Sequence, residues 1–168
     1  ELLAVNDHST DESPAILKKY SNLDKRIQFI ENQDKGIISA LRTAYQYSQG
    51  TLITRMDSDD MMPLQKLTVL AQNLLQAGTG HLATGGVEYF SATILGEGYQ
   101  RYALWLNELA RDGSHFSELY KECVIPSPCW MVFREDLDKC NGFEPYVYPE
   151  DYDLCFRFYE MGLKPIPC

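Results

Sequence analysis

Residues 52–63 read LITRMDSDDMMP, an apolar run followed by three carboxylates within four residues and then by a proline. The apolar run predicts a strand and the residues after Pro63 predict a helix, so the acidic run lies where a strand leaves a sheet. Side chains alternate along an extended segment, which would direct Asp57 and Asp59 to the same side. Their oxygens suit Mg²⁺ or Mn²⁺ and, through such a cation, a phosphate. An ordinary Asp-rich turn that caps the next helix is the other interpretation.

The composition limits the class of protein. The 168 residues are 45% hydrophobic, enough for one packed domain, so we predict a single domain over residues 1–168. A net charge of -9 argues against a nucleic-acid partner, and a phosphorylated ligand would need a cation. The five cysteines form no Cys-x-x-Cys pair, which predicts reduced core thiols and a cytoplasmic location. No apolar run approaches the roughly 20 residues of a membrane-spanning helix.

Strand and helix patterns alternate along most of the chain. Strands are predicted at 2–5, 27–30, 52–56, 82–90 and 130–133, and helices at 9–20, 37–48 and 63–78, with Ser9 and Glu12 at capping-box spacing. This order predicts an α/β fold with a mostly parallel mixed sheet flanked by helices. Ligands of such sheets bind beyond the carboxyl ends of the strands, so we expect the Asn6-Asp7 turn and Asp57–Asp60 at one rim. Residues 91–122 interrupt the alternation with two helix-like stretches, one over 102–109 and one around 116–120.

A second acidic pair follows Pro149. The proline and the two acids predict a helix that begins at Glu150-Asp151. Helical spacing puts Asp151 on a face with Leu154 and Phe158, and Glu150 on the polar flank. A carboxylate at the edge of an apolar site is a better general base than a solvated one, so Asp151 is the preferred base. The alternative is that Asp151 only caps its own helix.

Taken in order, these motifs resemble those of family 2 glycosyltransferases. The matching residues are Val5–Asp11, then Asn32, Gly36 and Arg42, then Asp57–Asp60, Gly142-Phe143 and Glu150-Asp151. The resemblance covers residues 1–162. It implies the GT-A fold, a Rossmann-like fold that binds nucleotide sugars, and inversion at the anomeric carbon.

The resemblance also implies a role for each matching residue. It assigns Asp7 to the nucleotide base, Arg42 to the nucleotide-binding helix, Asp57 to the ribose, Asp59 to the metal of a DXD motif, and Asp151 to catalysis as the base. It places Asp60 and Glu150 in supporting positions. Trp130 is a candidate for stacking on an acceptor sugar, with core packing as the other interpretation. The three histidines have no zinc spacing and are expected in turns or at the surface.

The implied activity is sugar transfer from a nucleoside-diphosphate sugar, with UDP-sugar the expected donor, to a glycan or lipid-linked acceptor. Mg²⁺ or Mn²⁺ would be the cofactor. Residues 91–130 would form an acceptor-side subregion. Such enzymes serve cell-wall or polysaccharide biosynthesis, and peripheral association with the inner face of the cell membrane is compatible with this role.

The sequence differs from the family pattern in two places, and two other functions are alternatives. The first βα unit is missing before Asn6, so we expect a fragment, and some relatives carry His where Ser127 stands. A sugar-phosphate nucleotidyltransferase would need a Gly-rich basic loop near the first strand. A noncatalytic nucleotide- or sugar-binding module would bind without turnover.

Overall fold

The computed structural model describes residues 1–168, which group into two compact units. The first unit comprises Glu1–Gly50 with Gly142–Glu150, and the second comprises Thr51–Asn141 with Asp151–Cys168. None of the helices combines the length and apolar composition that crossing a bilayer requires.

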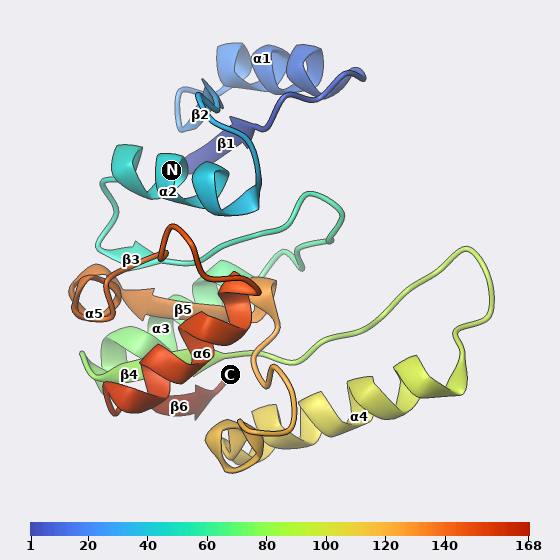
Figure 1. Ribbon diagram of the computed structural model, residues 1–168, viewed down its shortest axis with the longest axis vertical. Helices are drawn as coiled ribbons and strands as arrows, with labels where there is room; N and C mark the ends of the chain where they lie inside the picture. Colours follow the sequence, from blue (N-terminus) through green and yellow to red (C-terminus); the bar gives the residue numbers. More distant parts are fainter. The chain divides into compact units, whose positions relative to one another are not determined.

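The first unit is a pair of parallel strands with a helix on either side (Figure 1). Strands β1 (Leu2–Asn6) and β2 (Ile27–Glu31) pair from Leu2 opposite Ile27 to Asn6 opposite Glu31. Helix α1 (Ser13–Leu23) makes the crossover that parallel strands require, and α2 (Ile37–Tyr47) follows β2. The predicted elements at 27–30 and 37–48 are confirmed to within one residue.

The start of α1 differs from the prediction. The backbone N–H of Ser9 donates to Oδ1 of Asn6 at 3.2 Å, and the N–H of Ser13 donates to Oδ1 of Asp11 at 2.9 Å. The helix begins only at Ser13, with Pro14 in its first turn. The capping box at Ser9 is therefore wrong, because Ser9 belongs to the turn after β1 and the proline favours a later start.

The second unit contains a four-stranded mixed sheet in the order β3-β5-β4-β6. Its strands are β3 (Leu52–Ile53), β4 (His81–Thr84), β5 (Trp130–Phe133) and β6 (Lys164–Pro167). Strand β5 is antiparallel to β3 and β4 over two residue pairs each, whereas β4 and β6 are parallel over four pairs and β1 and β2 over five. Parallel pairing predominates, as predicted, although the strands form two sheets.

Helices cover both faces of this sheet (Figure 1). They are α3 (Lys66–Ala77), α4 (Glu97–Asp112), the short α5 (Arg134–Lys139) and α6 (Glu150–Glu160), whose first residue belongs to the first unit. Toward α3 lies a core cluster of Leu70, Leu74, Ala83 and Met131. Trp130 points to the opposite face, since neighbouring strand residues alternate, and its ring packs edge-on against Phe158 of α6 at 5.7 Å.

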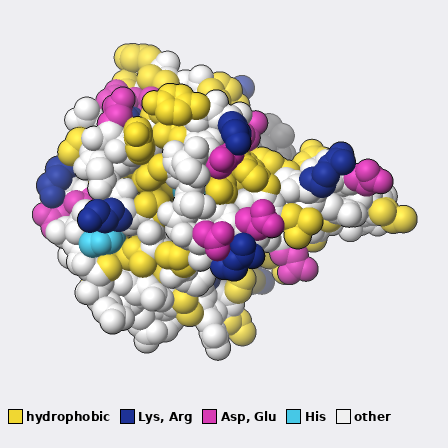
Figure 2. Space-filling model, turned by 90° about the horizontal axis from the view of Figure 1, so that it is seen from below, with side chains coloured by type: hydrophobic (Ala, Val, Ile, Leu, Met, Phe, Trp, Pro, Cys, Tyr) yellow, Lys and Arg dark blue, Asp and Glu magenta, His cyan; other side chains and the backbone are white.

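The segment from Gly85 to Gly96 leaves the sheet and leads to α4. Strand β4 ends at Thr84 instead of continuing to residue 90, because the backbone of Val87 bonds to the Asn107 side chain of α4 at 2.7 and 2.9 Å. A Cβ at Gly86 would lie 2.7 Å from the Asn107 amide oxygen, so this close approach requires glycine. The segment and the start of α4 project from the unit, and hydrophobic, basic and acidic side chains alternate over that projection in Figure 2.

His115 lies in a turn, as expected, but it is buried. It opens the short 3-10 helix His115–Glu118, is only 1% exposed, and its Nδ1 has no hydrogen-bond partner. Burial without a partner disfavours the charged imidazolium and lowers the pKa of His115 to about 4. The expectation of a surface position fails because the chain beyond the turn, including fully buried Leu119, packs into the core.

We expect the stability of the protein to fall when the pH is lowered from 7 to 5. Because the folded pKa of His115 lies below the unfolded value near 6.5, the unfolded chain binds the extra proton first, and stability is lost below about pH 6.5. The loss between pH 7 and 5 should be about 2 kcal/mol for this group. Urea unfolding at both pH values measures it, with His115→Leu as the comparison. Equal losses in both proteins would contradict the assignment.

Candidate functional site

The acidic run 57–60 forms a turn that is separated from the end of β3 by three residues. Strand β3 ends at Ile53, where Thr54 Oγ1 donates to the carbonyl oxygen of Trp130 at 2.6 Å. The backbone N–H of Asp60 donates to the carbonyl of Asp57 at 3.2 Å. Strand β3 therefore does not continue to residue 56, and because the acids lie in a turn, strand alternation does not set the directions of Asp57 and Asp59. This corrects one step of the sequence argument.

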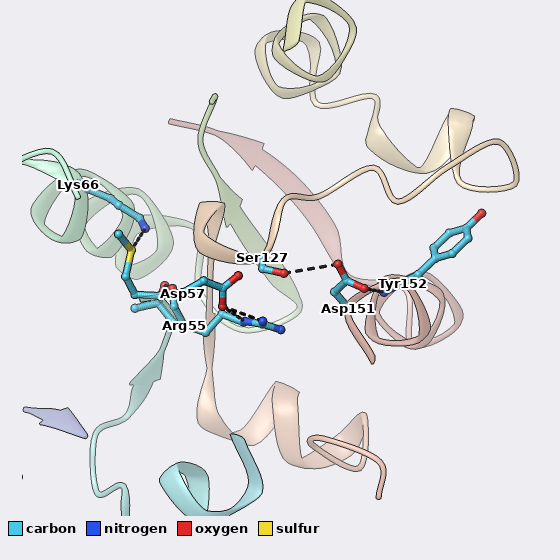
Figure 3. Close-up of polar contacts among 8 residues, drawn as sticks. Arg55, Asp57, Lys66, Ser127, Asp151 and Tyr152 are labelled. Atoms are coloured by element: carbon cyan, nitrogen blue, oxygen red, sulfur yellow. Dashed lines mark hydrogen bonds and ion pairs between the residues drawn. The ribbon is translucent and has the colours of Figure 1, made fainter. Parts of the chain in front are cut away.

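Asp57 is engaged by a buried arginine. Arg55 is 7% exposed, and its Nη2 lies 2.8 Å and its Nε 3.2 Å from Oδ1 of Asp57 (Figure 3). A charge-assisted hydrogen bond from a guanidinium at this distance fixes the position of the carboxylate. Sequence reasoning missed Arg55 because it stands within an apolar run, although a basic residue two positions before an acid was a usable signal.

Asp59 and Asp60 line a pocket of about 770 Å³ in the second unit. Its other walls come from the turn after the acids, the start of α3, the segment after β4 and the end of the 3-10 turn Ser127–Cys129, including Met61–Pro63, Lys66, Gly85–Phe90 and Cys129. Gly85 is held there by its N–H bond to the carbonyl of Cys129 at 2.9 Å. The pocket thus combines exposed carboxylates with a largely apolar wall.

Several charged side chains lie close together at the pocket. Loss of solvation, followed by the negative charges of Asp57 and Asp59, raises the pKa of Asp60. Lys66 is a basic residue in the lining, with its Nζ 3.8 Å from the sulfur of Met56, and burial lowers its pKa. Hard oxygen donors from two adjacent acids at the mouth of a pocket are a suitable partial ligand set for a divalent cation.

Asp151 lies in the first turn of α6, half-buried, as the helix-start prediction requires. Its Oδ1 accepts the N–H of Tyr152 at 2.8 Å, and Ser127 Oγ lies 3.5 Å from its Oδ2. In the view of Figure 3, Ser127 lies between the Arg55–Asp57 pair and Asp151. The hydroxyl of Ser127 thus lies at the outer limit of hydrogen-bond distance from Asp151, a contact that sequence spacing did not reveal.

Two candidates from the sequence lie elsewhere than expected. Glu150 is 6% exposed, so it is buried and not on the polar flank of α6. Helical spacing reports the face of a residue on its own helix and not the packing around it. Trp130 is 3% exposed and packs against Phe158, so core packing is the correct interpretation. We therefore leave Trp130 out of the proposed site.

In the first unit, Asp7 organises the turn before α2. Its carboxylate accepts the Asn32 side-chain amide at 2.8 Å and the N–H of Gly36 at 2.9 Å. The bond from Asn32 is the main cause that lowers the pKa of Asp7. Gly36 has φ of 106°, a conformation that favours glycine, which explains its place in the motif. Asp7 is thus a fixed anion next to the N-terminus of α2.

Arg42 extends from the middle of α2 within the same unit. Its Nη1 donates to the carbonyl oxygen of Phe143 at 2.6 Å, and the Phe143 ring packs edge-on against Tyr45. Gly142 has φ of 59° and lies against the Tyr45 ring, so the Gly142-Phe143 motif docks on α2. The nucleotide roles of Asp7 and Arg42 stay predictions.

The pocket, the acidic turn and the GT-A-like order of elements agree with one family. A family model described as glycosyl transferase family 2 matches residues 1–140. The chain belongs to glycosyltransferase family 2. A glycosyltransferase GlyA of Streptococcus pneumoniae is 31% identical over 173 residues, which cover 99% of this chain and 25% of that protein. An uncharacterized glycosyltransferase of Haemophilus influenzae is 30% identical over 170 residues, 96% of this chain and 52% of the relative.

A solved structure shows the same fold. The structure is that of a mannosyltransferase from Pyrobaculum calidifontis, PcManGT, in complex with GDP-Man and Mn²⁺. The match covers 100% of this chain and 45% of the PcManGT chain, with a TM-score of 0.70 and a sequence identity of 19%. The fold of this family 2 member is therefore GT-A, as predicted. The chain spans between a quarter and about half of these relatives' lengths.

Proposed function

We propose that the protein is a metal-dependent, inverting glycosyltransferase that moves a sugar from a nucleoside-diphosphate sugar to a glycan or lipid-linked acceptor. The pocket lined by Asp59 and Asp60 is the observation that carries this proposal. Family membership supports the class of reaction. The complex of PcManGT with GDP-Man and Mn²⁺ supports a divalent cation and a nucleotide-sugar donor.

The residues present fit a divalent cation. Mg²⁺ commonly uses one or two protein carboxylates and completes its coordination with water and substrate phosphates. Asp59 and Asp60 would supply those carboxylates. No group of three or more His, Cys, Asp or Glu side chains that could hold a metal ion is present. When bound, the cation would neutralise charge on the departing diphosphate. Arg55 would hold Asp57 in place for the donor ribose.

Asp151 would accept the proton from the acceptor hydroxyl. The N–H of Tyr152 donates to Oδ1 of Asp151, and Ser127 Oγ lies 3.5 Å from Oδ2. These two contacts would set the direction of the carboxylate before an acceptor binds. Inversion needs only one such base, because the acceptor displaces the nucleotide directly and no covalent sugar intermediate is formed. Transfer on the cytoplasmic side, at the inner face of the membrane, remains part of this proposal.

Nucleotide titration tests the proposal. We expect one of UDP, GDP and dTDP, with UDP first, to bind the purified protein in Mn²⁺ or Mg²⁺, and chelator to weaken that binding at least about tenfold. Isothermal titration measures the affinity, and release of nucleotide from the matching donor sugar measures turnover. Binding without turnover in the presence of candidate acceptors would favour a noncatalytic module. No metal-dependent binding would contradict the proposal.

A further inference from the structure

Two of the five cysteines lie next to each other in the second unit. Cys123 lies in the segment between the two 3-10 turns, and Cys155 lies on α6, 32 residues later in the chain. Their sulfur atoms are 3.9 Å apart and both thiols are free. Cys155 is 3% exposed, whereas Cys123 is half-buried. A reagent in solvent would therefore reach Cys123 first.

Contacts on both sides of Cys123 hold its segment against α6. On one side, the Tyr152 hydroxyl donates to the carbonyl of Leu119 at 2.6 Å. On the other side, Ser127 Oγ lies 3.5 Å from Asp151, one helical turn before Cys155. The segment 119–127 is thus attached to α6 on both sides of Cys123. A disulfide needs a sulfur separation near 2.05 Å, so an approach of about 1.9 Å would close the bond.

We propose that Cys123 and Cys155 form an oxidisable dithiol that closes to an intramolecular disulfide and ties segment 119–127 to α6. With a peroxide as the oxidant, the Cys123 thiolate attacks an oxygen atom, the O–O bond breaks, and the hydroxide that leaves takes up a proton to form water. The Cys155 sulfur then attacks the sulfenic acid on Cys123, the S–O bond breaks, and a second water leaves. Two thiols are oxidised and one peroxide is reduced.

The surroundings of the two thiols decide which of them reacts first with the oxidant. Hydrogen bonding with the Cys123 thiol, together with burial, raises the pKa of Cys155, so Cys155 is the resolving thiol. The buried Cys129 and Cys140 have no thiol neighbour at a comparable distance, and burial raises the pKa of each to about 11. The remaining cysteine, Cys168, is exposed and would react independently.

Thiol counting after mild oxidation tests the proposal. The purified protein with Cys168→Ser, which removes the exposed thiol, is treated with hydrogen peroxide, and unfolded samples are titrated for thiols with and without reductant. We expect the loss of two thiols, full recovery with dithiothreitol, and a cross-linked peptide pair containing Cys123 and Cys155 in the non-reduced digest. Additional Cys123→Ser should abolish both the reversible loss and the cross-link.

Two results would overturn the proposal. One is a cross-link that joins other cysteines or other molecules. The other is an oxidised protein that keeps all its thiols while its circular dichroism and melting temperature show that it is folded. Because Cys123 is only half-buried, its replacement by serine should leave the melting temperature within a few degrees, which keeps the variant informative. Neither readout depends on sugar transfer, so its outcome is separate from that of the proposed function.

Discussion

Replacing Asp151 with asparagine should lower kcat by about 10³-fold, the scale of general-base catalysis. Asparagine keeps the size of the side chain and one oxygen, which can accept the Tyr152 N–H. Its NH2 group replaces the oxygen next to Ser127 and can donate to the Ser127 hydroxyl oxygen, but asparagine does not accept the acceptor's proton. The affinity for the donor nucleotide should stay within about threefold, because Asp151 is assigned to the acceptor and not to the donor. Single-turnover transfer and nucleotide titration measure the two effects.

Asp153→Asn is the matched control for this substitution. Asp153 lies two residues further along α6 and pairs with Arg157 at 2.7 Å, so its substitution removes the same charge from the same helix. We expect a change in kcat of less than about threefold, because Asp153 is engaged by Arg157 and has no assigned contact with either substrate. If Asp151→Asn lowers kcat no more than Asp153→Asn does, Asp151 is not the base and serves only the N-terminus of α6.

Replacing Asp59 with asparagine should weaken nucleotide binding in Mn²⁺ by about 100-fold, which corresponds to about 2.7 kcal/mol. The substitution preserves shape and removes the charge that would hold the cation at the pocket. In chelator, the variant and the original protein should bind the nucleotide equally weakly. Isothermal titration in both conditions measures this difference.

The neighbouring Ser58 supplies a control within the same turn. Ser58 is exposed, so Ser58→Ala should leave the metal-dependent affinity within about twofold. Asp59→Asn with unchanged affinity in Mn²⁺ would remove Asp59 from the metal site. A loss that persists equally in chelator would instead show that the turn itself is damaged.

Local patterns predicted the regular elements well. Strand β5 has the bounds expected from its apolar run, and α3 ends where Gly78 adopts φ of 82°. Two strands are shorter than expected for reasons distant in the sequence. Strand β3 stops because Thr54 bonds to Trp130, and β4 stops because Asn107 binds the backbone of Val87. Hydrogen bonds to side chains replaced the ladder bonds that a sequence pattern assumes.

The sequence by itself determined the family motifs, the α/β order of elements and the positions of the acids, because strand alternation, helix periodicity and glycine conformations depend on near neighbours in the chain. Only the tertiary structure decided that Glu150, Trp130 and His115 are buried and that Ser127 meets Asp151. It alone brought Cys123 to Cys155. These features depend on contacts between residues far apart in the chain, and burial or pairing of that kind has no local signature.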